Sequence, residues 1–352
     1  MRIAQVAPLA EAVPPKRYGG TERVVSWLTE ELVAQGHQVT VFASADSVTS
    51  AELVTCAPQG LRLAGIRDFI ASHLVMLDRV RRRADDFDII HFHTDLLQFA
   101  NFQELSHKCV TTLHGRLDLP DFMPVFEAFP QMPLVSISRS QRAPLPPYVH
   151  WLANIYHGLP PGLGPYNAVG GDYLTFLGRI SPEKRPDRAI EIAKRAGVPL
   201  KIAAKVDKVD EPYFEEVIRP LLDHPLIDFI GEIGDGEKPE FLGNARALLF
   251  PIDWPEPFGL VVIEAMATGT PVIAWACGSV PEVVAHEVSG FIVDSIEDAV
   301  RAVEMASRLR RAAVRADFEA RFTATRMARD YLGAFRRLLA QSSRTPQLVA
   351  AE

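Results

Sequence analysis

Short apolar runs of strand length alternate with segments of helical period along almost the whole chain. Residues 3–7 form one such run, residues 21–35 carry apolar side chains at helical spacing up to Gly36, and residues 39–43 form the next run. Parallel strands need a long crossover connection, usually a helix, so this order is typical of a parallel sheet. The alternation therefore predicts an α/β fold built from doubly wound sheets.

The chain has 352 residues, which is more than one typical domain needs. Residues 158–172 are rich in Gly and Pro, and the alternation starts again after them. We therefore expect a linker there between two doubly wound domains. Further strands are expected at residues 89–93, 110–113, 134–137, 174–177, 200–204, 228–230, 247–251, 272–274 and 291–293.

Composition excludes several classes of function. With 48% hydrophobic and 23% charged residues the chain resembles a soluble globular protein, and its net charge of -7 gives no general attraction to nucleic acid. Cys56, Cys109 and Cys277 lack the paired spacing of a disulfide framework or a zinc site. Residues 1–10 do not resemble a signal peptide, and no apolar run is long enough to span a membrane. We expect a cytoplasmic protein.

The strongest local pattern is Glu256-Pro-Phe-Gly-Leu-Val-Val-Ile-Glu264, in which a loop leads into an apolar helix. We expect the helix to begin near Phe258, so that the free N–H groups of Phe258, Gly259 and Leu260 favour an anion or a sugar oxygen. Glu256 precedes the helix and Glu264 lies nearly two turns inside it. The alternative interpretation is a helix-capping acid followed by a surface residue.

A basic pair follows the expected strand 174–177 in the segment Gly178-Arg179-Ile-Ser-Pro-Glu-Lys184. Arg179 can bind two phosphate oxygens at once and Lys184 adds a point charge, so a loop that carries both is suited to hold a phosphate. An ordinary solvated loop is the alternative.

Gly19-Gly20-Thr21-Glu22 stands at the start of the first expected helix. Its N–H groups could bind a phosphate, but the dinucleotide-binding pattern of three spaced glycines is absent.

Histidines stand near strand ends in the first half of the chain. We expect His91 and His93 to point to opposite faces of the sheet, which argues against a shared metal. His114 follows the strand 110–113, a suitable place for proton transfer or for donating to a reacting oxygen. A local structural role is the alternative for His114.

A D-x-D pattern, Asp86-Phe-Asp88, precedes the strand 89–93 and so lies at its amino end, away from the ligand-binding edge. We interpret it as a solvated loop and expect no metal site.

Taken in order, these segments resemble the GT-B glycosyltransferases, specifically the retaining nucleotide-sugar transferases of glycosyltransferase family 4. Glu256 and Glu264 have the spacing of that family's E-x7-E signature, and Arg179 with Lys184 resembles its phosphate-binding pair. The resemblance extends over nearly the whole chain. Other matching segments are Gly19-Gly20-Thr21-Glu22, Leu113-His114-Gly115, Gly278-Ser-Val-Pro-Glu282 and Ser289-Gly-Phe-Ile-Val293.

The resemblance implies two Rossmann-like domains that face a central cleft. Residues 1–160 would form the acceptor-side domain and residues 170–322 the domain that binds the donor, with a final helix, 325–341, returning to the first domain. Glu256 would bind the sugar hydroxyls, Glu264 the ribose and Gly231 the base. The implied donor-binding residues are Gly19, Gly20, Arg179, Lys184, Gly231, Glu256, Phe258, Gly259, Leu260 and Glu264, and the implied catalytic residues are His114, Arg179, Lys184 and Glu256.

The implied reaction is the transfer of a hexose with retention, without metal or cofactor, from a nucleotide diphosphate sugar to a sugar, lipid or small-molecule acceptor. UDP-glucose is favoured as donor, with GDP-mannose next. The segment 154–158, Asn-Ile-Tyr-His-Gly, departs from the family's usual turn and leaves the acceptor open. An epimerase or phosphorylase of the same fold, and a non-catalytic nucleotide-sugar sensor, are the alternatives.

The carboxyl-terminal segment 301–344 carries eleven Arg and four acidic residues. This charge admits a weak contact with a membrane surface. Met327, Tyr331 and Phe335 recur at helical spacing, however, which favours a helix packed on protein, and we expect the tail from Ser342 to be disordered.

Overall fold

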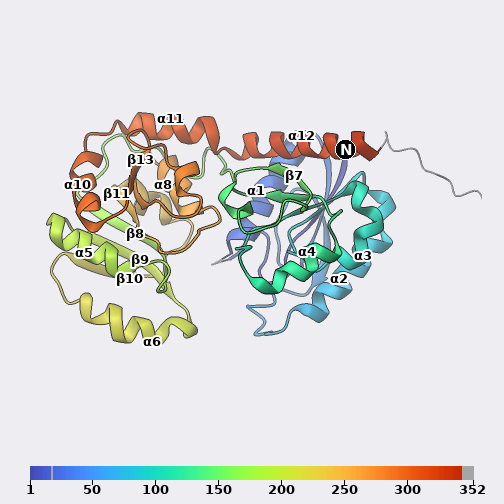
Figure 1. Cartoon of the computed structure of the whole chain (residues 1–352), viewed down its shortest axis with the longest axis horizontal. Helices are drawn as coiled ribbons and strands as arrows, with labels where there is room; N and C mark the ends of the chain where they lie inside the picture. Colours follow the sequence, from blue (N-terminus) through green and yellow to red (C-terminus); the bar gives the residue numbers. More distant parts are fainter. Residues whose placement is uncertain (17–18, 343–352) are drawn as a thin grey trace, which may run out of the picture. The chain divides into compact units, whose positions relative to one another are not determined.

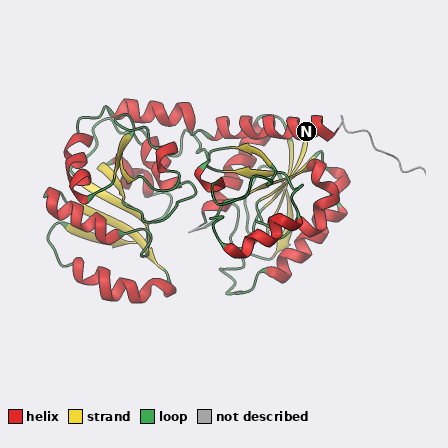
Figure 2. Ribbon diagram, in the orientation of Figure 1, coloured by secondary structure: helices red, strands yellow, loops and turns green. Residues whose placement is uncertain are grey.

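The computed structural model describes residues 1–16 and 19–342 and divides into two compact units. Unit 1 is Met1–Gly158 with the chain from Ala324 onward, and unit 2 is Leu159–Thr323. Each unit is a parallel sheet with helices on both faces (Figures 1 and 2). The predicted pair of Rossmann-like α/β domains is confirmed.

The sheet of unit 1 has seven parallel strands in the order β3-β2-β1-β4-β5-β6-β7. The strand order reverses between β1 and β4, which lie side by side, and ligands of doubly wound sheets bind at the carboxyl ends of such strands. The strands are β1 (Arg2–Val6), β2 (Gln38–Ser44), β3 (Glu52–Ala57), β4 (Ile89–Phe92), β5 (Cys109–Thr112), β6 (Leu134–Ser136) and β7 (Trp151–Asn154), and the helices are α1 (Gly20–Ala34), α2 (Ile70–Arg82), α3 (Phe99–Phe102), α4 (Met123–Ala128) and α12 (Ala324–Ser342).

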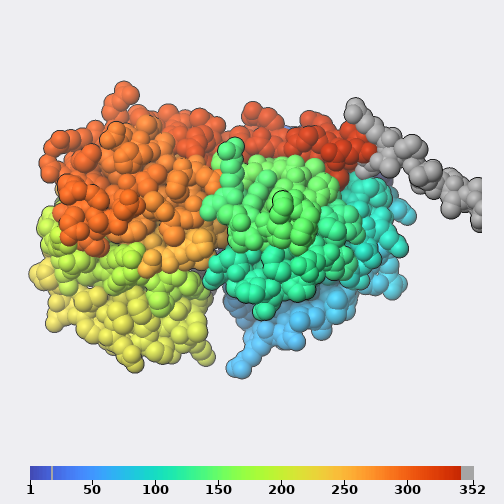
Figure 3. Space-filling model, viewed as in Figure 1, coloured from blue at the N-terminus to red at the C-terminus, as the bar shows by residue number. Residues whose placement is uncertain are grey.

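The apolar periodicity does not predict β3 and β7, the two edge strands of this sheet. Both are only partly buried, so neither carries the continuous apolar run that marks the central strands. After β3 the chain makes an exposed excursion at residues 62–68, which projects in light blue from the surface of unit 1 in Figure 3.

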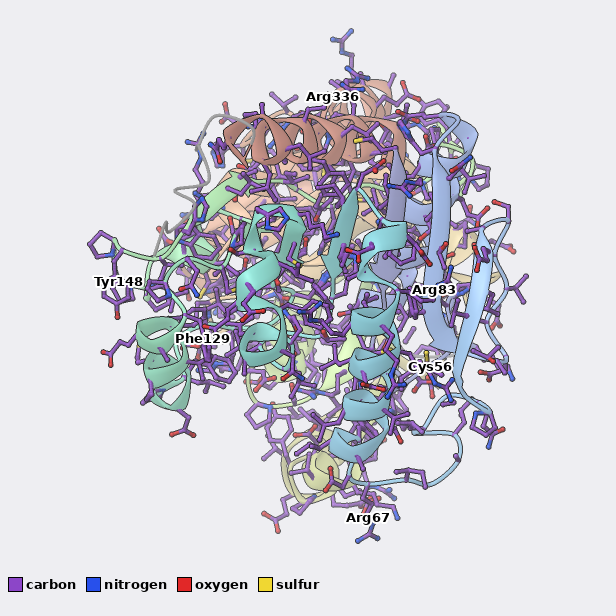
Figure 4. All side chains as sticks on the ribbon, turned by 90° about the vertical axis from the view of Figure 1, so that its right-hand side faces the viewer. Cys56, Arg67, Arg83, Phe129, Tyr148 and Arg336 are labelled. Atoms are coloured by element: carbon purple, nitrogen blue, oxygen red, sulfur yellow. The ribbon has the colours of Figure 1, made fainter. Side chains whose placement is uncertain are left out.

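Helix α12 belongs to unit 1 although it comes last in the sequence. Its apolar stripe is buried, with Met327, Tyr331 and Phe335 fully inaccessible, while Arg336 points away from the sheet in Figure 4. The Tyr331 hydroxyl lies 2.9 Å from Oγ1 of Thr112 on β5. The tail from Ser343 lies outside the described residues.

Unit 2 contains a six-stranded parallel sheet in the order β10-β9-β8-β11-β12-β13. Here the order reverses between β8 and β11, so the carboxyl ends of these two strands form the expected ligand-binding edge. The strands are β8 (Tyr173–Ile180), β9 (Leu200–Val206), β10 (Ile227–Gly231), β11 (Ala245–Phe250), β12 (Val272–Trp275) and β13 (Gly290–Val293), and the helices are α5 (Pro186–Ala196), α6 (Glu211–Tyr213), α7 (Lys238–Gly243), α8 (Leu260–Ala267), α9 (Val280–Val283), α10 (Ile296–Ala306) and α11 (Arg311–Arg321).

Two arginines of the basic carboxyl-terminal segment stabilise unit 2 through hydrogen bonds to backbone carbonyls. The Arg311 guanidinium donates to the backbone carbonyls of Asn167, Gly243 and Ala245. Arg315 donates to the carbonyl of Gly164. These charges hold the 159–172 segment against the rest of unit 2. Within the described part of the chain, no helix is both long and apolar enough to span a bilayer.

Candidate functional site

Arg179 is a residue of strand β8, which continues to Ile180. The expectation that it lies on a loop is therefore wrong, because the strand extends past the apolar run. Its guanidinium pairs with Glu183 and lies 3.5 Å from Asp210 and 3.9 Å from Asp207. Burial raises the pKa of Asp210, and the neighbouring carboxylates of Glu183 and Asp207 add to this rise, which the charge of Arg179 opposes. The guanidinium thus stands at the ligand-binding edge among three acidic side chains.

Lys184 and Glu256 form an ion pair across the same edge of the sheet. Lys184 follows β8 and Glu256 follows β11, so the fold joins residues that are 72 positions apart. The Lys184 ammonium also lies 4.8 Å from the ring centre of Trp254 and 5.8 Å from that of Phe250. An ammonium over aromatic faces is held electrostatically, which fixes the charge in one place.

The loop that carries Glu256 is held by Gly278, and the sequence motif around this glycine does not predict that role. Gly278 has φ +58°, and a Cβ there would lie 2.3 Å from the backbone nitrogen of Glu256. Next to it, the N–H of Ser279 donates to the Glu256 carbonyl and its hydroxyl donates to the Phe258 carbonyl, each at 2.9 Å. The motif that begins at Gly278 therefore fixes the position of Glu256.

Helix α8 begins at Leu260, with Gly259 as its N-cap at φ +82°. The expected start at Phe258 is too early, because the backbone turns at Gly259 before the helix begins. Phe258 is buried and its ring packs edge-on against Phe322. Leu260 and Glu264 are half-buried on the helix.

Gly231 ends strand β10 with φ +77°, and a Cβ there would have no neighbour within 4 Å. No hydrogen bond described for unit 2 links Gly231 or Leu260 to the Lys184–Glu256 pair.

In unit 1, Gly19 is the N-cap of α1 and Gly20 its first residue. A Cβ on Gly19 would lie 2.8 Å from Cβ of Pro15 and 2.9 Å from Oε2 of Glu22, so this position is packed. Glu22 is buried in the first turn, and burial raises its pKa to about 7. The acid close to these glycines therefore ionises near neutral pH.

His114 belongs to a cluster of histidines at the carboxyl ends of β4 and β5. Its Nε2 lies 2.8 Å from Nδ1 of His93, and its ring stacks on that of His157 at 5.3 Å. His91 and His93 lie on the same face, with ring centres 4.1 Å apart. The expectation of opposite faces is wrong, since positions two apart on a strand share a face.

Burial is the main cause of low pKa values throughout this cluster. It lowers the pKa of His91 and of His114 to about 3 and that of His93 well below its usual value, with nearby histidines adding to the fall for His91 and His93. All three rings are therefore neutral at pH 7, so they act through hydrogen bonds and not through charge.

The turn that carries His114 is held by Gln141, a residue that belongs to no sequence motif of the chain. The buried Gln141 amide donates to the carbonyls of Leu113 and Gly115 at 2.9 and 2.7 Å, one on each side of His114. Nothing in the sequence near Gln141 marks this role, because the two segments meet only in the folded unit.

The D-x-D aspartates are engaged in ion pairs at the amino end of β4. Asp88 pairs with Arg2 at 2.8 Å and Asp86 with Arg83 at 2.9 Å. Across residues 1–16 and 19–342 no group of three or more His, Cys, Asp or Glu side chains could hold a metal ion.

Two family models match the chain, one on each unit. The model described as glycosyltransferase family 4 matches residues 18–159, and the one described as glycosyl transferases group 1 matches residues 167–321. A phosphatidyl-myo-inositol mannosyltransferase of Mycolicibacterium smegmatis is 27% identical over 330 residues, which cover 85% of this chain and 82% of that protein.

Solved structures match the whole fold. AviGT4, a glycosyltransferase involved in avilamycin A biosynthesis, is 25% identical with a TM-score of 0.71, over 97% of this chain and 98% of that one. HepE of Anabaena, solved in complex with UDP-glucose, is 16% identical with a TM-score of 0.68, over 98% of this chain and all of HepE. The GT-B class is thus shared with proteins of low sequence identity.

Proposed function

Since this chain belongs to the GT-B glycosyltransferases, with the features of family 4, we propose that it transfers a hexose with retention from a nucleotide diphosphate sugar. Unit 2 would bind the donor and unit 1 the acceptor. UDP-glucose is our preferred donor and GDP-mannose the next. The observation that carries this proposal is the placement of Arg179, Lys184 and Glu256 at the strand-order reversal of unit 2.

In the proposed reaction the bond between the sugar C1 and the diphosphate oxygen breaks, and the acceptor oxygen bonds to C1 on the same face. The acceptor proton passes to the departing diphosphate. Negative charge grows on the diphosphate, so fixed cations such as Arg179 and Lys184 lower the barrier. The side chains already stand in place through their ion pairs with Glu183 and Glu256.

The other donor-binding assignments follow from the family pattern. Glu256 would exchange its ion pair with Lys184 for hydrogen bonds to the sugar hydroxyls. Glu264 would bind the ribose, and Gly231 would let the backbone approach the base. The N-terminal N–H groups of α8, starting at Leu260, would face the anionic donor.

In unit 1, Gly19 and Gly20 at the start of α1 would approach the diphosphate. His114 would lie at the reacting centre as a neutral hydrogen-bonding group.

The test is incubation with a panel of nucleotide sugars while free nucleotide is measured and the anomeric configuration of any product is determined by NMR. We expect slow release of UDP from UDP-glucose, protection against melting by UDP, and the same activity in EDTA. Inversion at C1 would contradict retention. Complete loss in EDTA with recovery in Mn²⁺ would contradict the metal-independent reaction, and interconversion of donors without nucleotide release would indicate an epimerase.

A further inference from the structure

The side chain of Gln5 reaches His114 through one intervening histidine. Gln5 lies on β1, opposite His91 of β4 in the sheet register, and is fully buried. Its Oε1 lies 2.8 Å from Nε2 of His93, and Nδ1 of His93 lies 2.8 Å from Nε2 of His114. Three side chains, one on β1, one directly after β4 and one shortly after β5, thus form one hydrogen-bonded line.

The order of donors along this line follows from the amide oxygen. With Oε1 of the Gln5 amide facing His93 and the amide nitrogen of Gln5 without a partner among the described residues, His93 carries its proton on Nε2 and donates it to Gln5, because a carbonyl oxygen only accepts. A neutral imidazole has one proton, so Nδ1 of His93 is an acceptor and Nε2 of His114 must donate to it. The Nδ1 atom of His114 is then left without a proton.

That Nδ1 atom is buried and has no hydrogen-bond partner among the described residues. A buried acceptor without a partner costs free energy, which a ligand that supplies a hydroxyl can recover. The atom lies beyond the carboxyl end of β5, at the ligand-binding edge of the sheet.

We propose that Gln5 and His93 are positioning residues that hold His114 in its Nε2–H tautomer, so that its Nδ1 accepts a hydrogen bond from a substrate hydroxyl. This proposal rests on the proposed role of His114 at the reacting centre. The hydrogen bond made by one ring nitrogen of a histidine generally decides whether the other ring nitrogen is protonated. Here the bond from His114 goes to His93, whose own tautomer depends on the Gln5 amide of another strand.

Two substitutions at Gln5 distinguish the effect of its acceptor oxygen from the effect of its side-chain length. Gln5→Met removes the oxygen, so both tautomers of His93 and His114 become populated. Gln5→Glu keeps an oxygen that accepts from His93 Nε2 and should preserve the tautomer. Thr112→Val is the control, because it removes the contacts of Thr112 with His91 at 2.8 Å and with the Tyr331 hydroxyl at 2.9 Å and does not touch the line to His114.

The first measurement is long-range ¹H–¹⁵N correlation NMR of the full chain with ¹⁵N-labelled histidine. We expect His114 in the Nε2–H form in the wild type, in Gln5→Glu and in Thr112→Val, and a mixture in Gln5→Met. A wild-type His114 protonated on Nδ1, or a tautomer that does not change in Gln5→Met, would overturn the proposal.

The second measurement is donor turnover and KM with the donor found in the panel above. Gln5→Met should lower turnover roughly 2 to 10-fold, the loss expected when one hydrogen bond to the substrate is weakened, with KM nearly unchanged. Recovery in Gln5→Glu supports positioning. If the tautomer changes but turnover does not, His114 acts elsewhere and the positioning role is overturned. Full turnover in His114→Ala would instead contradict the proposed function of His114, whatever the NMR result.

Discussion

Units 1 and 2 share one architecture but build their ligand-binding edges from opposite chemistry. Unit 2 places charged side chains there, Arg179 and Lys184, each paired with a carboxylate and still partly accessible to solvent. Unit 1 places neutral histidines there, of which His91 and His93 are buried and hydrogen-bonded to other neutral groups. The same fold thus provides one edge for charge and one for directed hydrogen bonds.

The difference follows from what each kind of group costs to bury. A charge at a partly exposed edge keeps some hydration and needs only a partner of opposite sign, as Glu256 provides for Lys184. A fully buried histidine avoids the cost of a charge by staying neutral. We infer that unit 2 is suited to a diphosphate and unit 1 to uncharged hydroxyl groups.

Removing α12 should have the largest effect on stability. It should destabilise unit 1 and leave unit 2 folded. Truncation before Thr325 strips the buried Tyr331 and Phe335 from unit 1, so we expect unit 1 to unfold or aggregate while unit 2 keeps its protection. Hydrogen exchange by mass spectrometry reports the two units separately. Truncation after Ser342 is the control and should leave both units protected. A folded unit 1 without α12 would show that the helix is dispensable.

Removing a positive charge from the ligand-binding edge of unit 2 should have the next largest effect, and this effect is on turnover. Arg179→Ala and Lys184→Ala should each lower turnover roughly 10² to 10³-fold, the usual loss when one fixed donor to a developing charge is removed. Arg195→Ala is the control, because Arg195 forms an exposed pair with Glu297 on the same unit. Turnover is measured with the folded state checked by circular dichroism. Near-normal rates in both variants would remove these residues from the donor site.

Acidification should weaken unit 1 before unit 2. Burial holds the folded-state pKa of His91 and of His93 far below the ordinary value of 6.5, so their stabilisation is complete above pH 6.5 and is lost as the pH falls toward the folded pKa. Each such histidine costs up to about 1.4 kcal/mol per pH unit in this window.

Burial also raises the pKa of Glu22 and of Asp95, which act in the opposite direction, but these are two groups against several histidines. Hydrogen exchange between pH 7.5 and 5 should therefore show β4 and β5 opening before β8 and β11. The reverse order would contradict the assignment of neutral histidines to unit 1.

Replacing Glu22 should have the smallest effect and a sign that depends on pH. Its folded-state pKa is raised to about 7 from 4.5, so its contribution to stability is complete below pH 4.5 and is lost as the pH rises through 7. Glu22→Gln should therefore raise the free energy of unfolding at pH 8 by about 1 to 3 kcal/mol and change it little at pH 4.5. Urea unfolding at the two pH values measures this. The exposed Glu127→Gln is the control, and an equal change at both pH values would mean that Glu22 is not buried.

Sequence patterns alone predict the two α/β units, most strand positions and the segments that reach the ligand-binding edges. These features depend on local periodicity and on short motifs, such as the one from Glu256 to Glu264, which neighbouring residues in the chain specify. The edge strands β3 and β7 were missed because a half-exposed strand lacks the apolar run that marks a central one.

Which side chains meet depends on the folded arrangement of the strands and loops. The contact of Lys184 with Glu256, the support of Glu256 by Gly278, and the line from Gln5 to His114 each join segments that are far apart in sequence. Whether a histidine is neutral, or which nitrogen holds its proton, depends on burial and on partners from other strands. Periodicity specifies which way a side chain faces, but its partner comes from another strand, and sheet packing alone brings the two together.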